Sequence, residues 1–146
     1  MAMEQRMIRF LQKHLVLTLS TSTERGGWTA HCFYAWVPGR EAFVFTTDPE
    51  TRHGSDMLKN PNVSVGIVLE TKVIGLIRGI QLTGRSFPCT DGDEEYTTCR
   101  NAYLKKFPFA LAAKLDLWIL FPDRIKMTDN RLGFGKKLEW VREEGR

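Results

Sequence analysis

Hydroxyl and basic side chains gather within residues 46–53, where Thr47, Thr51, Arg52 and His53 follow one another closely. A phosphate group needs several directed hydrogen-bond donors, and hydroxyls with a guanidinium supply them. Thr51 also stands where the N-cap of a following helix would be, and the free N–H groups and dipole at a helix N-terminus favour an anion. These residues predict a phosphate site, although an ordinary strand-to-helix turn with a solvated arginine explains them equally well.

A strand and a short helix must position this cluster. Residues 43–47 alternate as a strand, and a turn at Asp48 and Pro49 follows. Met57 and Leu58 then begin the apolar face of the helix that Thr51 would cap. The hydroxyls are therefore expected at the junction between a strand end and a helix start.

The rest of the chain is rich in strands, because apolar and polar side chains alternate between turn residues. The predicted strands cover residues 15–21, 28–37, 63–67, 76–87, 115–127 and 138–141, and the predicted helices cover residues 4–13 and 91–107. Gly79 and Gly84 lie inside one predicted strand, which indicates a bulge, a barrel corner or the close approach of a ligand. One small barrel with peripheral helices fits this succession best.

Composition limits the class of protein. The 146 residues fit a single domain, residues 1–146, and the net charge of +4 is spread along the chain, so nucleic acid is not an expected partner. No apolar run is long enough to span a bilayer, so no membrane partner is expected. Cys32, Cys89 and Cys99 are odd in number and lack CxxC spacing, which favours a reduced, cytoplasmic protein without a disulfide framework or a metal site.

Three segments resemble the FMN-binding split-barrel superfamily of pyridoxamine 5'-phosphate oxidase-like proteins. They are FTTDPETRH followed by MLKNPNVSVGI, then IRGIQLTGR, and then LWILFPDRIKMTDN. The motifs KKFP and IKMTDNRLGFGKKLEW are similar to the bacterial YhbP-like branch, and this likeness spans nearly the whole chain. The resemblance implies a mainly β fold, a six- to seven-stranded antiparallel split β-barrel with Greek-key-like connections and peripheral helices.

The resemblance also implies FMN as the cofactor. Its phosphate would be held by the strand-end hydroxyls and the residues after the loop, at positions Thr46, Thr47, Thr51, Arg52 and His53. His53 departs from the lysine usual in the oxidases, and a neutral imidazole is a weaker phosphate partner, so the site would be looser or sensitive to pH. A histidine on a solvated helix surface is the other interpretation.

Gln81 matches the glutamine that reaches the polar edge of the isoalloxazine, although an outward-facing polar residue in an amphipathic strand is the simpler interpretation. Arg78 would bind phosphate or form an ion pair at an interface.

The strand over residues 28–37 has no arginine or lysine where the oxidases carry a basic pair. Its flavin contacts would be main chain with His31, Cys32, Phe33 or Tyr34, although the aromatic residues here are more often plain core. The missing pair argues against pyridoxamine phosphate as the substrate.

The resemblance implies a homodimer with flavin sites at the interface and an oxidoreductase acting on an unknown small molecule. Two alternatives remain open. One is a flavin or haem carrier or sensor without turnover, for which His31 or His14 would be the iron ligand, and the other is a barrel that has lost its cofactor. The tail positions would cover the flavin or a partner subunit, or form a mobile surface loop: Asn130, Leu132, Gly133, Phe134, Lys136 and Lys137.

Overall fold

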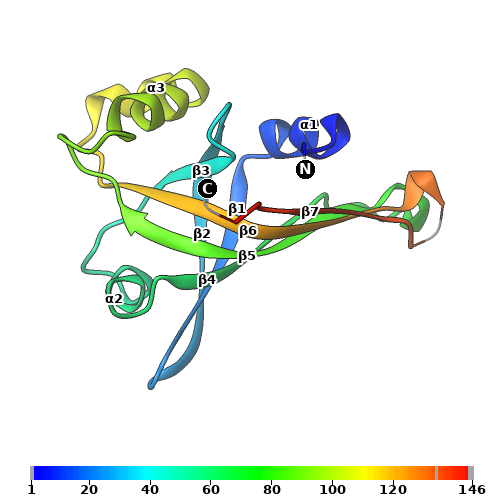
Figure 1. The fold of residues 1–146 in the computed structure, drawn as a ribbon, viewed down its shortest axis with the longest axis horizontal. Coiled ribbons are helices and arrows are strands. Elements are labelled where there is room, and N and C mark those ends of the chain that lie inside the picture. Colours follow the sequence, from blue (N-terminus) through cyan, green and yellow to red (C-terminus); the bar gives the residue numbers. More distant parts are fainter. Residues whose placement is uncertain (1, 134, 145–146) are drawn as a thin grey trace.

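The computed structural model describes residues 2–133 and 135–144, and within them seven antiparallel strands form one sheet that closes into a barrel (Figure 1). The strands are β1 Val16–Thr23, β2 Gly26–Val37, β3 Ala42–Thr46, β4 Asn62–Val68, β5 Arg78–Pro88, β6 Leu117–Asp129 and β7 Lys137–Val141. Their order is β3-β2-β1-β4-β5-β6-β7, and an additional pairing of β3 with β6 closes the barrel. Because β4 lies beside β1 after the β1-β2-β3 meander, the order is that of a Greek key. The predicted fold class is confirmed.

Alternation of side chains fills the barrel. Leu17 and Leu19 of β1 are buried between more exposed neighbours, and Val63, Val65 and Ile67 of β4 follow the same alternation. Such period-two burial defines one apolar face per strand, so closing the sheet buries all of these faces together.

The long strand β6 carries a bulge beside Gly84 of β5. Thr83 pairs with Arg124 but Gly84 pairs with Pro122, so one residue of β6 is skipped. A Cβ atom on Gly84 would lie 2.5 Å from the carbonyl oxygen of Phe121, closer than any side chain allows. The bulge predicted from the interior glycines is therefore located at Gly84.

Three α-helices lie around the barrel in the described part of the chain: α1 Gln5–Lys13, α2 Arg52–Lys59 and α3 Tyr96–Lys106. Helix α1 buries Met7, Phe10 and Leu11 against the main core. Helix α3 buries Cys99 and Tyr103 in a second apolar cluster outside β2, β3 and β6. None of the helices in the described residues is long and apolar enough to cross a membrane.

Several predicted boundaries were wrong. The helix expected over residues 91–107 begins at Tyr96, because Gly92 has φ of +102° and the Asp93 carboxylate accepts a hydrogen bond from the Thr90 amide at 2.7 Å. The strand expected from residue 76 begins at Arg78, after a 3-10 turn over Ile74–Leu76.

Two further expectations need correction. Leu58, expected on the apolar face of α2, is 57% exposed, whereas Met57 is buried. The loop expected from residue 128 begins later, because β6 continues to Asp129 and a 3-10 turn, Asn130–Leu132, follows it. Phe134 of the predicted tail site lies outside the described residues.

Candidate functional site

The junction between β3 and α2 is held rigidly on both sides. The Thr47 amide donates to the Asp116 carbonyl at 3.1 Å, and the Trp118 indole Nε1 donates to the Thr47 carbonyl at 3.1 Å. The turn that follows is closed by the Thr51 hydroxyl, which donates to the Asp48 carbonyl at 2.7 Å. The end of β3 and the start of α2 therefore keep fixed positions relative to each other.

Thr51 caps α2 as its position predicts. Its backbone is extended, and its Oγ1 accepts a hydrogen bond from the Gly54 amide at 3.1 Å. Gly54 is required here, because a Cβ atom would lie 2.6 Å from the Asp48 carbonyl oxygen and 2.9 Å from the Pro49 Cα. Turn and helix are packed too tightly at this point for any side chain.

Three of the predicted phosphate residues meet at this helix N-terminus. The Nε2 atom of His53 shares a hydrogen bond with the Thr47 hydroxyl and lies 3.4 Å from the Thr51 hydroxyl. Partial burial lowers the pKa of His53 below its ordinary value, although the nearby Asp56 carboxylate acts in the opposite direction. His53 is thus a neutral donor or acceptor at pH 7, and the cluster consists of two hydroxyls and an imidazole.

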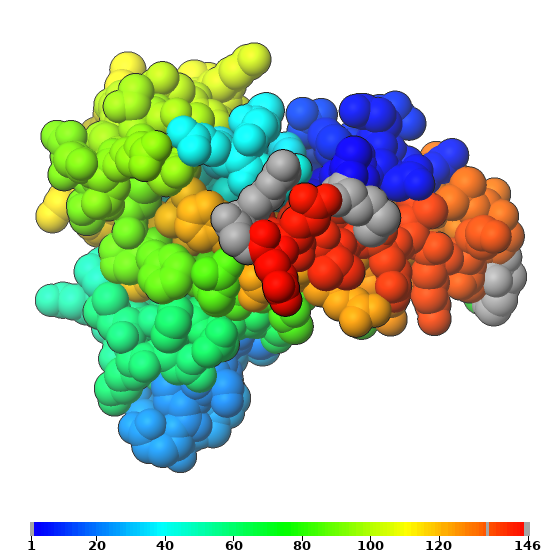
Figure 2. Space-filling view, viewed as in Figure 1, coloured from blue at the N-terminus to red at the C-terminus, as the bar shows by residue number. Residues whose placement is uncertain are grey.

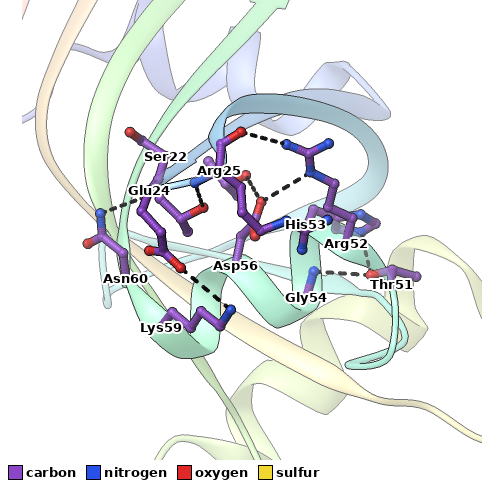
Figure 3. A network of polar contacts seen from close by, with 12 residues as sticks. Ser22, Glu24, Arg25, Thr51, Arg52, His53, Gly54, Asp56, Lys59 and Asn60 are labelled. Atoms are coloured by element: carbon purple, nitrogen blue, oxygen red, sulfur yellow. Dashed lines mark hydrogen bonds and ion pairs between the residues drawn. The ribbon is translucent and has the colours of Figure 1, made fainter.

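Arg52 points away from these hydroxyls, towards the β1–β2 hairpin (Figure 3). Its guanidinium carbon lies 4.3 Å from the centre of the Trp28 ring, and its Nη2 donates to the Arg25 carbonyl at 3.4 Å. Its Nε is 3.9 Å from Oδ2 of Asp56, a fully buried carboxylate that also accepts a hydrogen bond from Thr21 at 2.9 Å. Arg52 is therefore stacked and paired within the chain.

Thr46 and two of the β2 residues point elsewhere. The Thr46 hydroxyl lies 3.1 Å from the Tyr103 hydroxyl of α3. Cys32 and Tyr34 face the barrel interior, where burial raises the pKa of the Cys32 thiol to about 11 and the Tyr34 hydroxyl donates to the Leu11 carbonyl at 2.7 Å. Only the main chain of these two residues remains for a ligand on the outer surface. Phe33, between them, is 55% exposed on that surface.

Gln81 lies in a row of outward-facing residues that crosses four strands. In the strand registers, His31 of β2 pairs with Thr18 of β1, Thr18 with Gly66 of β4, and Gly66 with Gln81 of β5. At the usual strand spacing the two ends of this row are about 14 Å apart. The Thr18 hydroxyl and His31 Nδ1 are 3.0 Å apart, so the imidazole ring is held along the row.

A groove of about 590 Å³ follows this outer face, and Gln81 and Arg78 both line it. Gly66 and Gly79 lie in its wall and lack side chains, while Val16 and Val68 give it apolar edges. A groove of this size with apolar walls and few polar groups is typical of small-molecule sites. Strand β2 connects it with the α2 cluster, because Phe33 pairs with Val16 and Tyr34 with Phe45 near the end of β3.

Sequence reasoning missed several residues around these sites. Asp56 lies one helical turn after Arg52, and that spacing could have indicated the pair. Lys106 is half-buried, donates to the His14 carbonyl and lies 4.3 Å from the centre of the Tyr34 ring, and burial lowers its pKa to about 8. No local pattern points to Lys106, because its partners come from α1 and β2.

Comparison with known proteins agrees with this fold. The family model described as "Pyridoxamine 5'-phosphate oxidase" matches residues 3–123. A UPF0306 protein of Serratia proteamaculans is 42% identical over 95% of this chain and 95% of its own length.

Two solved structures are similar in fold. A haem-binding protein from Mycobacterium smegmatis superposes with a TM-score of 0.70 at 22% identity, covering 87% of this chain and 52% of that protein, so the chain spans about half its length. An FAD-binding protein from Mesorhizobium loti has a TM-score of 0.67 at 15% identity, covering 84% of this chain and 89% of that one. The resemblance found in the sequence motifs is confirmed, and the chain belongs to the pyridoxamine 5'-phosphate oxidase family.

Proposed function

We propose that the chain binds FMN and acts as an oxidoreductase on a small molecule. The observation that carries this proposal is the meeting of Thr47, Thr51 and His53 at the N-terminus of α2. This set fits a phosphate, because the Thr47 hydroxyl and the first helix amides can donate to its oxygens, and the helix dipole favours its charge. The Thr51 hydroxyl donates to the Asp48 carbonyl and so holds the turn that presents these donors. Arg52 adds positive charge from beside the site, where Asp56 and Trp28 hold it.

The groove on the outer face fits the ring system. Its apolar walls and the bare backbone at Gly66 and Gly79 leave space for a flat ring, and Gln81 offers a donor to a polar edge. When bound, the flavin would supply the redox chemistry, while the protein binds and orients it and keeps water from its reactive face. On β2, Phe33 would contribute its side chain, and Cys32 and Tyr34 their main chain.

Exposed apolar side chains on this face favour a homodimer with the flavin sites at its interface. Val16 is 41% exposed, Phe33 55% and Val68 61%, and all three lie on the outer surface of neighbouring strands. Apolar patches of this kind mark interaction surfaces. A second copy packed here would also cover the groove.

The test is an absorbance spectrum of the purified protein before and after adding FMN, with size-exclusion chromatography alongside. We expect a flavin band that elutes with a dimer, and quenching of flavin fluorescence on titration. A protein that shows neither a flavin band nor FMN binding would contradict the proposal and favour a barrel without a cofactor.

Haem binding without turnover is the second candidate, because His31 stands on the outer face at the end of the row that includes Gln81. Its Nδ1 is engaged by Thr18, which leaves Nε2 to face outward as an iron ligand. Haem added to the purified protein would then give a Soret band that His31→Ala removes. A Soret band unchanged in His31→Ala would exclude this ligand.

A further inference from the structure

A second hollow, lined mostly by basic side chains with Phe10 and Met127 among them, lies between α1, the start of β5 and the end of β6. Its volume is about 350 Å³, and its cationic members are Arg6, Arg9, Lys13, Arg78 and Arg131. Figure 2 shows the N-terminal helix, in dark blue, beside the orange segment that follows β6. We call this hollow the basic pocket.

Helix α1 contributes three of these side chains from one face. Arg6, Arg9 and Lys13 are three and four residues apart, so they follow one another along the same side of the helix. The residues that α1 buries in the core, among them Met7 and Leu11, leave that side to the pocket. The sequence of α1 thus presents a stripe of positive charge to β5 and β6.

One carboxylate balances part of this charge. Asp129 is fully buried, and it accepts hydrogen bonds from Arg6 Nη1 at 3.1 Å and from Arg131 Nη2 at 2.9 Å. Arg9, Lys13 and Arg78 have no ion pair with a carboxylate within the described residues. Asp129 cancels one of the five positive charges, so a net charge of four remains around one small volume, an arrangement that attracts anions.

Arg78 independently indicates that a hydrogen-bond acceptor is missing from the pocket. Its Nε atom is shielded from solvent and makes no hydrogen bond to any described residue. Buried donors are almost always bonded in native proteins, so such an atom, in a residue that lines both the basic pocket and the groove, indicates an acceptor that the chain itself does not supply. His14, at the same wall, has its pKa lowered by burial and by the charges of Lys13 and Arg78.

We propose that the basic pocket is a second anion-binding site that takes a small polyanion bearing phosphoryl groups. Guanidinium groups present paired donors that match the oxygens of a phosphoryl group, and four of the five cations are arginines. The site is distinct from the α2 cluster, which offers neutral hydroxyls and an imidazole. It does not depend on whether the chain binds a flavin.

Calorimetric titration of the full chain with inorganic pyrophosphate tests the proposal. We expect one pyrophosphate per chain, and at least about tenfold weaker binding in the double variant Arg9→Gln, Lys13→Gln, which loses two charge-assisted contacts. The control Arg100→Gln, Lys114→Gln removes the same net charge elsewhere and is expected to bind as the unmodified chain does. Equal weakening in both double variants, or the absence of binding, would overturn the proposal.

Two further arms separate this site from the others. With FMN present at saturation, pyrophosphate should bind with unchanged affinity, whereas competition between them would show that the two ligands share a site and would overturn a separate second site. Citrate serves as the carboxylate probe, and tighter binding of citrate than of pyrophosphate would overturn the phosphoryl assignment. A chain that takes pyrophosphate but no FMN would support the basic pocket and contradict only the proposed flavin function.

Discussion

Arg52 Nε lies 3.9 Å from Asp56 Oδ2, one turn later on the same helix, and this pair faces the β1–β2 hairpin rather than the hydroxyls at the helix N-terminus (Figure 3). Asp56 is fully buried, so its charge must be satisfied within the chain. The side chain of Thr21 donates to it, while Asp56 Oδ1 and Arg52 Nε have no hydrogen-bond partner among the described residues. The pair therefore depends strongly on the one hydroxyl from β1.

Thr21→Val removes this donor and should destabilise the protein. A buried carboxylate that loses a hydrogen bond costs about 1–3 kcal/mol. Urea unfolding monitored by circular dichroism measures the change in the free energy of unfolding. Thr29→Val, on the exposed part of β2, is the matched control and should change stability by less than about 0.5 kcal/mol. Equal stabilities of the two variants would show that Asp56 does not depend on Thr21.

Thr47→Val should weaken FMN binding at least about tenfold, because a hydrogen bond to a charged phosphate contributes about 1.5–3 kcal/mol. Thr46 is the matched control, since the neighbouring hydroxyl lies against Tyr103 and not at the N-terminus of α2. Fluorescence titration of FMN compares the two variants. A loss of affinity in Thr46→Val equal to that in Thr47→Val would place the phosphate elsewhere.

Local patterns predicted the parts of the site that local geometry decides. Thr51 as an N-cap and a strand before the turn at Asp48 follow from neighbouring residues. The cap is confirmed, and the strand ends at Thr46, one residue earlier than predicted. The direction of Arg52 could not be predicted, because its carbonyl partner, Arg25, lies 27 residues away and is brought there by closure of the barrel.

The basic pocket illustrates the same limit. Arg6 and Asp129 are 123 residues apart in the sequence, and only the packing of α1 against the end of β6 joins them. Among the secondary elements, β1, β4 and β5 were predicted well because burial alternates along each of them. The start of α3 was missed because Gly92 and a side-chain hydrogen bond of Asp93 replace the first helical turn.

Gly54→Ala should distort the turn at Asp48 and Pro49, which packs against the first turn of α2. The new Cβ would collide with two main-chain atoms, the Asp48 carbonyl oxygen and the Pro49 Cα, which cannot move aside as a flexible side chain would. We expect a loss of about 1–3 kcal/mol in the free energy of unfolding, with weaker FMN binding. Gly75→Ala is the control, because nothing lies within 4 Å of its added Cβ. Thermal unfolding of both variants would decide, and a stable Gly54→Ala protein would mean that the turn is not tightly packed.

Val68→Asp tests the proposed dimer. Val68 is 61% exposed on the outer face of β4, at the edge of the groove, so a charge there would be buried between two copies. Sedimentation velocity should show a shift from dimer to monomer. Val141→Asp, on β7 at 45% exposure, introduces the same charge away from the groove and should leave the dimer intact. If Val68→Asp sediments like the unmodified chain, the interface lies on another face.

Protonation of Asp129 should account for much of the loss in the free energy of unfolding at acid pH. Hydrogen bonds from Arg131 and Arg6 lower the pKa of this carboxyl from 3.8 to about 2. The folded state therefore binds its proton less readily than the unfolded state, so stability that is fully present above about pH 4 is lost as the pH falls towards 2. This pKa difference corresponds to about 2 kcal/mol in the free energy of unfolding.

In Asp129→Asn this part of the pH dependence should vanish, and stability at pH 7 should fall because two arginines lose their shared partner. Asp123→Asn is the control, since Asp123 forms a partly exposed ion pair with Arg85 that contributes little. Thermal unfolding between pH 2 and 7 measures both, and an unchanged acid slope in Asp129→Asn would show that other carboxyl groups set the acid stability.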